Sequence, residues 1–127
     1  MTYLIGKTFS FSASHSLPDL PVGHQCARLH GHNYRVEVVL RAEDLSPPGF
    51  VTDFADLSPF KTYLQATLDH RHLNDVLPAA PTSENLAAHL AAWFIENLQP
   101  ALRPRLATVR VQETDSTWAE YHPAVQR

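Results

Sequence analysis

Two stretches in which side chains alternate in character constrain this fold more than any other feature. In residues 3–15, apolar side chains occupy every second position up to a final histidine: Phe9, Phe11, Ala13 and His15. Because successive side chains of a strand point to opposite faces, this pattern predicts a strand with one apolar face. The strand would deliver His15 to the end of that face, where a buried polar group needs a partner.

A second alternating stretch covers residues 31–42, with Tyr34, Val36, Val38 and Leu40 on one face. It follows the run Cys26-Ala27-Arg28-Leu29-His30-Gly31-His32. The same alternation places His30 and His32 on the apolar face. Residues 17–25 contain two prolines and a glycine and are expected to form a loop, so the two strands would pair as a long antiparallel hairpin.

The sequence pattern after residue 42 predicts two helices and two further strands. The first helix begins near Asp56 or Ser58, and the second begins at Thr82 or Ser83 and ends before Pro100. A third strand spans residues 106–114, and a fourth, short strand spans residues 118–122. One face of the third strand is expected to carry Ala107, Val109, Val111 and Glu113. The order ββααββ predicts an α+β fold over residues 1–127, a single domain with two helices on one face of a four-stranded antiparallel sheet.

Composition narrows the class of protein. The length of 127 residues corresponds to one domain, and a net charge of −3 gives no electrostatic reason to expect nucleic acid or an anionic membrane as a partner. The sequence shows neither an apolar run of membrane-spanning length nor the apolar segment of a secretion signal, so a cytoplasmic location is expected. Cys26 is the one cysteine, which excludes an intrachain disulfide and leaves a metal ligand or a reactive thiol.

Three histidines suggest a metal site. Catalytic zinc takes three protein ligands and keeps one position open, and His15, His30 and His32 would meet at the strand ends on the buried side. The alternative is that each is an ordinary hydrogen-bonded histidine. Cys26 has three interpretations: a fourth zinc ligand that closes a structural site, a free thiolate that acts as a base, or a small buried side chain.

Two further positions carry acid–base chemistry. Asp69 and His70 are adjacent, and a carboxylate that orients an imidazole tunes a general acid or base, although neighbouring residues need not bond to each other. Glu113 lies on an otherwise apolar strand face, where a carboxylate needs a donor. That donor is either internal or a ligand with two parallel N–H groups, such as a pterin or guanine; a position at the sheet rim is the other possibility.

These motifs together resemble the 6-pyruvoyltetrahydropterin synthase family. The resemblance covers almost the whole chain, in order: His15, Cys26-x₃-His30-Gly31-His32, Val51-Thr52-Asp53-Phe54, Leu68-Asp69-His70, Pro81-Thr82-Ser83-Glu84-Asn85 and Val111-Gln112-Glu113-Thr114. The run from Gly23 to His32 is most similar to the bacterial branch that forms 6-carboxy-5,6,7,8-tetrahydropterin in queuosine biosynthesis.

The resemblance implies a tunnelling fold, in which protomers join edge to edge into a barrel and assemble as a homohexamer, a dimer of trimers, with active sites at subunit interfaces. It implies Zn²⁺ on His15, His30 and His32 and proton abstraction by Cys26. It assigns Asp69 and His70 to an acid–base relay and Glu113 to pterin binding. Thr82 and Ser83 would line the pterin pocket.

The implied reaction is a zinc-dependent carbon–carbon lyase step that converts 7,8-dihydroneopterin triphosphate to 6-carboxy-5,6,7,8-tetrahydropterin, acetaldehyde and triphosphate. Within the same fold, the alternatives are formation of 6-pyruvoyltetrahydropterin and cleavage of sepiapterin-like side chains. Outside it, they are a zinc hydrolase and a zinc-stabilised binding module without catalysis, in which Cys26 closes the metal site.

Overall fold

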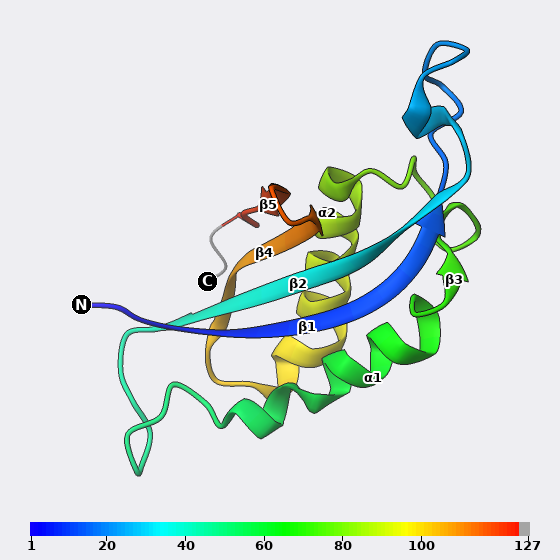
Figure 1. Ribbon diagram of the computed structural model, residues 1–127. Coiled ribbons are helices and arrows are strands. Elements are labelled where there is room, and N and C mark those ends of the chain that lie inside the picture. Colours follow the sequence, from blue (N-terminus) through cyan, green and yellow to red (C-terminus); the bar gives the residue numbers. More distant parts are fainter. Residues whose placement is uncertain (125–127) are drawn as a thin grey trace.

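A long antiparallel pair of strands forms the centre of the protein (Figure 1). The computed structural model describes residues 1–124. Strands β1 (Tyr3–His15) and β2 (His30–Ala42) pair in continuous register, from Tyr3 opposite Ala42 to His15 opposite His30. The two alternating stretches therefore form the predicted pair of strands, and the connecting loop brings two histidines face to face at its base.

The sheet has the strand order β3-β1-β2-β4-β5. Strands β4 (Arg105–Thr114) and β5 (Thr117–Tyr121) continue the antiparallel sheet beyond β2. Strand β3 (Arg71–His72) pairs in parallel with β1 on the opposite side. The predicted antiparallel four-stranded sheet is confirmed, and β3 adds a fifth strand. With two residues, β3 is too short for alternation to reveal it.

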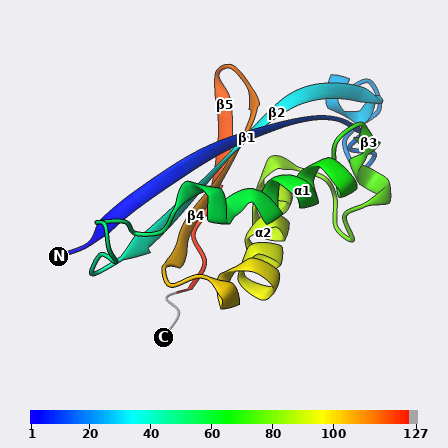
Figure 2. The same ribbon diagram turned by 90° about the horizontal axis from the view of Figure 1, so that it is seen from below.

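Two helices cover one face of this sheet (Figure 2). Helix α1 (Ser58–Thr67) follows a 3₁₀ turn at Phe54–Leu57, and helix α2 (Ser83–Trp93) has Thr82 as its N-cap. The chain of α2 continues as a π-helix at Phe94–Leu98 and a 3₁₀ turn at Gln99–Ala101. The α+β fold is thus confirmed. None of the helices within residues 1–124 has the length and hydrophobicity needed to cross a membrane.

One predicted strand face is wrong at its first residue. Val39 pairs with Thr108 while Leu40 pairs with Leu106, so a β-bulge leaves Ala107 without a partner on β2. Leu106 is therefore the buried residue at this end of β4, and Ala107 is only partly buried. A bulge inserts one extra residue and reverses the alternation before it, and no residue type in this segment signals the insertion.

The core lies between the helices and the apolar face of the sheet. It includes Phe9 and Phe11 of β1, Val36 and Val38 of β2, and the buried stripes of both helices. Each fully buried large apolar side chain contributes about 1.5–3 kcal/mol to stability. Of the residues described, only His15 and Gln99 are polar and buried, with His15 1% exposed. The apolar face of β1 therefore ends in a buried imidazole.

Candidate metal centre and active site

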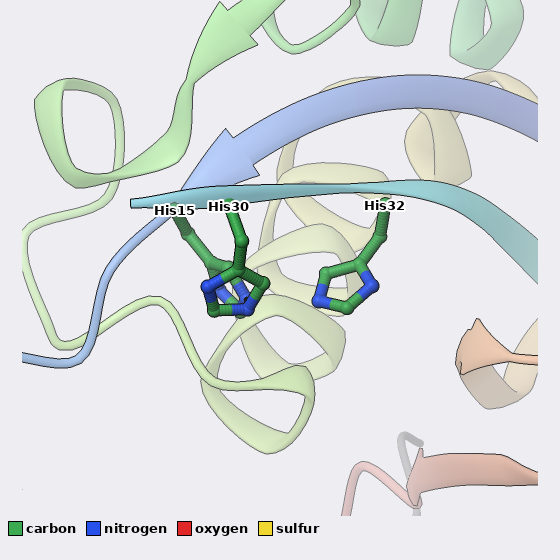
Figure 3. A group of neighbouring side chains, drawn as sticks. All are labelled: His15, His30 and His32. Atoms are coloured by element: carbon green, nitrogen blue, oxygen red, sulfur yellow. Dashed lines mark hydrogen bonds between the residues drawn. The ribbon is translucent and has the colours of Figure 1, made fainter. Parts of the chain in front are cut away.

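Three imidazoles converge at the end of the β1–β2 pair (Figure 3). His15 ends β1, His30 begins β2 directly opposite it, and His32 is two residues further on the same face. One ring nitrogen from each lies within 4.8 Å of the other two. Uninterrupted alternation through both strands places the rings on one side of the sheet, so they can hold a metal ion.

Backbone carbonyls fix the protonation of two of these rings. His15 Nδ1 lies 2.7 Å from the carbonyl oxygen of Pro81, and His30 Nδ1 lies 2.7 Å from that of Arg28. Because a carbonyl only accepts, both Nδ1 atoms must carry the proton. In the neutral rings, the two Nε2 atoms are then both acceptors, yet they face each other at 2.9 Å. A cation between them would satisfy both lone pairs.

The third imidazole, that of His32, has a ring nitrogen that makes no hydrogen bond within residues 1–124. This nitrogen, Nε2, is buried, and the Glu113 carboxylate lies 3.3 Å away from it. Burial is the largest influence on the pKa of His32 and lowers it, assisted by His15 and His30 and opposed by the Glu113 carboxylate. His32 is therefore held as a neutral imidazole, the form that binds metals.

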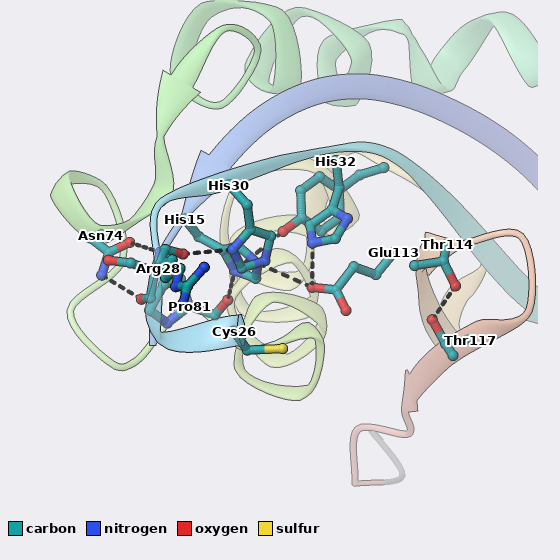
Figure 4. Close-up of polar contacts among 12 residues, drawn as sticks. His15, Cys26, Arg28, His30, His32, Asn74, Pro81, Glu113, Thr114 and Thr117 are labelled. Carbon is teal, nitrogen blue, oxygen red and sulfur yellow. Dashed lines mark hydrogen bonds and ion pairs between the residues drawn. The ribbon is translucent and has the colours of Figure 1, made fainter. Parts of the chain in front are cut away.

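Glu113 adds a carboxylate to the cluster (Figure 4). Its Oε1 lies 3.3 Å from both His15 Nε2 and His32 Nε2. A second β-bulge, between Gln112 and Thr114, falls at this residue. The cluster thus combines three imidazole nitrogens with a carboxylate oxygen, a set of groups that fits a divalent metal ion.

Cys26 lies beside the cluster and is not one of its members. It is the central residue of a 3₁₀ turn, Gln25–Ala27, capped by the His24 side chain. Its backbone carbonyl accepts a hydrogen bond from Leu17 N at 3.0 Å. The side chain is partly buried, and in Figure 4 its sulfur points toward the side of the site where Glu113 lies. The group of residues placed to hold a metal ion thus comprises the three histidines, with the Cys26 thiol next to it.

Asp69 and His70 do bond to each other, with 3.0 Å between Asp69 Oδ2 and His70 Nδ1. The Ser12 N–H donates to Asp69 Oδ1 at 2.9 Å and is the main cause that lowers the pKa of Asp69, followed by His70. The Ser12 N–H lies in the plane of the sheet, so Asp69 binds the edge of β1 beside β3. Over the described residues, no hydrogen bond or ion pair joins Asp69 or His70 to the three histidines.

Thr82 and Ser83, at the start of α2, have different surroundings. Thr82 Oγ1 accepts a hydrogen bond from Asn85 N at 3.1 Å and caps α2. Ser83, the first residue of α2, lines a cavity of about 520 Å³ together with Glu113, Glu84 and Trp118. Thr82 is not among the residues that line this cavity, so of the two predicted pocket residues Ser83 is the one placed beside Glu113.

Sequence reasoning missed three residues around the site. Tyr34 is buried, with its hydroxyl 3.4 Å from His15 Nδ1, and burial raises the pKa of its phenol. His72 contacts Ser14 Oγ through Nδ1 at 3.0 Å, and Asn74 contacts the backbone of Ser16. Alternation on β2 could have identified Tyr34, because it shares a face with His32. The other two depend on the pairing of β3, which left no sequence signal.

Comparison with known proteins identifies the family and agrees with the fold. The 6-pyruvoyl tetrahydropterin synthase family model matches residues 4–124. A 6-carboxy-5,6,7,8-tetrahydropterin synthase from Synechocystis is 39% identical over 94% of this chain and 92% of its own length. The human 6-pyruvoyl tetrahydrobiopterin synthase is 32% identical over 92% of this chain and 89% of its own.

A solved structure agrees as well. The Caenorhabditis elegans 6-pyruvoyl tetrahydropterin synthase superposes with a TM-score of 0.83 at 27% identity, covering 98% of this chain and 97% of that one. The fold and the histidine cluster thus define a pterin-synthase-like α+β protein with a candidate metal centre. The chain belongs to the 6-pyruvoyl tetrahydropterin synthase family.

Proposed function

We propose that this protein is a zinc-dependent carbon–carbon lyase that forms 6-carboxy-5,6,7,8-tetrahydropterin from 7,8-dihydroneopterin triphosphate, releasing acetaldehyde and triphosphate, in queuosine biosynthesis. The observation that carries the proposal is the cluster of three imidazoles, in which the Nε2 atoms of His15 and His30 face each other as acceptors and His32 Nε2 makes no hydrogen bond within residues 1–124. The name of the Synechocystis relative supports this product, and the human relative represents the alternative, 6-pyruvoyltetrahydropterin.

Zinc fits the proposed site because it accepts three imidazoles and keeps a fourth position free. His15, His30 and His32 would hold it, with two of the rings already oriented by backbone carbonyls. When bound, zinc would act as a Lewis acid on the oxygens of the substrate side chain and make the adjacent protons easier to remove.

The chain's own groups would then move the protons and hold the ring. Cys26, a partly buried thiol on the turn beside the cluster, is the proposed base that takes a side-chain proton. Glu113 is the proposed anchor of the pterin, because a carboxylate can accept two parallel N–H bonds and Glu113 lines the cavity that Ser83 also lines. Thr82 would contribute through the helix start that it caps.

The position of Asp69 and His70 supports active sites shared between subunits. The pair lies at the edge of β1, makes no hydrogen bond to the histidine cluster within residues 1–124, and has the His70 side chain 83% exposed. We therefore assign this relay to a neighbouring protomer's zinc site. Edge-to-edge pairing of protomers into trimers, and of trimers into a homohexamer, would bring the two together and cover the free edges of β1 and β5.

The deciding experiment is an anaerobic incubation of zinc-loaded protein with dihydroneopterin triphosphate, with products identified by mass spectrometry. The proposal predicts the mass of carboxytetrahydropterin and release of acetaldehyde. A pyruvoyl product would be consistent with the same zinc site but would assign the protein to the 6-pyruvoyltetrahydropterin-forming branch of the family.

A variant separates catalysis from metal binding. Cys26→Ala is expected to retain zinc and lose turnover, because the thiol lies outside the metal cluster. If zinc affinity and stability fall together in this variant, and the wild type shows no turnover, the binding-module alternative replaces the lyase.

A further inference from the structure

Asn74 binds the backbone of one residue, Ser16, with both ends of its side-chain amide (Figure 4). Asn74 Oδ1 accepts from Ser16 N at 3.0 Å, and Asn74 Nδ2 donates to Ser16 O at 2.9 Å. Both bonds are partly buried. The amide therefore pairs with Ser16 as a neighbouring strand would, at the point where β1 has just ended.

This contact is anchored in the core. Asn74 belongs to a 3₁₀ turn, Leu73–Asp75, in which Leu73 is fully buried. The turn directly follows β3, which pairs with Ala13 and Ser14 of β1. Asn74 thus has a fixed position relative to the end of β1.

Ser16 lies between the metal cluster and the Cys26 turn. It follows His15 directly, and the next residue, Leu17, donates its N–H to the Cys26 carbonyl at 3.0 Å. The other hydrogen bonds of loop 16–28 are local, such as His24 N to Pro21 O. Over the described residues, the two bonds from Asn74 are the hydrogen bonds that tie this loop to a distant segment.

We propose that Asn74 is a positioning residue that holds the Cys26 turn at a set place relative to His15, His30 and His32. The proposal rests on the function assigned to Cys26 above. The metal cluster itself does not need Asn74, because His15 is held separately by its pairing with His30 and by the Pro81 carbonyl. Loss of the clamp should therefore loosen the loop and leave the three imidazoles in place.

The test compares Asn74→Ala with Asn97→Ala in zinc-loaded protein. Asn97 also donates its amide to a backbone carbonyl, that of Trp93 at 3.0 Å, but it lies on the helix layer. For Asn74→Ala we expect unchanged zinc content, faster amide hydrogen exchange in residues 16–28, and alkylation of Cys26 by iodoacetamide several-fold faster. Since a small misplacement of a reacting group can cost about 100-fold, kcat should fall by up to that factor while KM changes little.

A conservative variant sharpens the result. Asn74→Asp keeps the acceptor for Ser16 N and loses the donor to Ser16 O, so it should lie between Asn74→Ala and the wild type in exchange, alkylation and kcat. Asn97→Ala should match the wild type in all three.

Two outcomes would overturn the assignment. Unchanged exchange and alkylation in Asn74→Ala would show that the loop does not depend on the clamp. Loss of zinc would show that Asn74 supports the metal ligands instead. Exchange and alkylation require no substrate, so they test the clamp even if the proposed reaction fails.

Discussion

His32 and His89 are two partly buried histidines that differ in the groups facing Nε2. Burial is the main cause that lowers the pKa of each, so both are held neutral. His89, on α2, has its Nε2 2.8 Å from the hydroxyl of Tyr63, which itself stacks on Trp93 at 4.1 Å between ring centroids. His32 Nε2 has no such hydrogen-bond partner among residues 1–124 and faces two further imidazoles.

The difference separates a structural histidine from a candidate ligand. A buried polar atom without a partner costs about 1–3 kcal/mol, and His89 avoids that cost through the Tyr63 hydroxyl. In His32, a cation between the rings would satisfy this nitrogen and also neutralise the Glu113 carboxylate 3.3 Å away. Burial and the direction of the pKa shift are the same for the two histidines; the groups that face Nε2 distinguish them.

The largest expected effect on zinc affinity comes from removing the His32 imidazole. Mutation of a residue that only supports a metal ligand lowers metal affinity or activity by about 10–100-fold. His32 is a proposed direct ligand, so we expect His32→Ala to lower zinc affinity and kcat/KM by more than this. The matched variant His89→Ala should keep both within a few-fold of the wild type. Zinc titration and turnover measure the effect, and equal losses in the two variants would remove the distinction between them.

Zinc should also stabilise the fold. At a free zinc concentration about 1,000 times the Kd, binding to the folded state adds about 4 kcal/mol to the free energy of unfolding. We expect denaturant titrations with zinc or with a chelator to show this difference in the wild type and in His89→Gln. In His32→Ala the difference should be small, and a full zinc effect there would contradict the three-histidine site.

His70 extends the comparison to an exposed histidine under backbone strain. Its φ of 60° is in the left-handed region, which favours glycine. We expect His70→Gly to be more stable than His70→Ala by about 1 kcal/mol, because both lack the imidazole and only glycine relieves the strain. Both variants should lose turnover. Thermal unfolding checks the order, and His70→Ala as the more stable variant would show that the backbone is unstrained.

The smallest effect concerns pH. The pKa of His89 is lower in the folded protein than its ordinary value of 6.5, so below that pH the unfolded chain binds more protons. Stability contributed by neutral His89 is thus complete above pH 6.5 and declines as pH falls toward the folded pKa. His89→Gln, which keeps an acceptor for Tyr63, should show a shallower decline in unfolding free energy between about pH 6.5 and 5. Equal slopes in the two proteins would argue against a buried neutral imidazole.

Most of the fold and the clustering of the three histidines could be predicted because alternation in β1 and β2 is unbroken. The alternating apolar residues of 9–15 show on which face of its strand His15 lies. Those of Tyr34–Leu40 do the same for His30 and His32. Alternation failed at Ala107, where a bulge inserts a residue, and it could not detect the two residues of β3.

The rest of the site depends on contacts that no sequence pattern encodes. The carbonyls of Pro81 and Arg28 orient two rings, yet every residue has a carbonyl. Asp69 and His70 form the bonded pair that their adjacency left open, but the place of this pair at the edge of β1 follows from the bond between Asp69 and Ser12. The clamp by Asn74 requires that β3 bring a distant turn to the end of β1.

The most direct test of the account is X-ray absorption at the zinc edge of the zinc-loaded wild-type protein. The account predicts three histidine nitrogens at about 2.0–2.1 Å, a further light-atom ligand from solvent or substrate, and no sulfur. A zinc–sulfur distance of about 2.3 Å would place Cys26 in the coordination sphere. That result would contradict the free-thiol site and favour a closed structural centre.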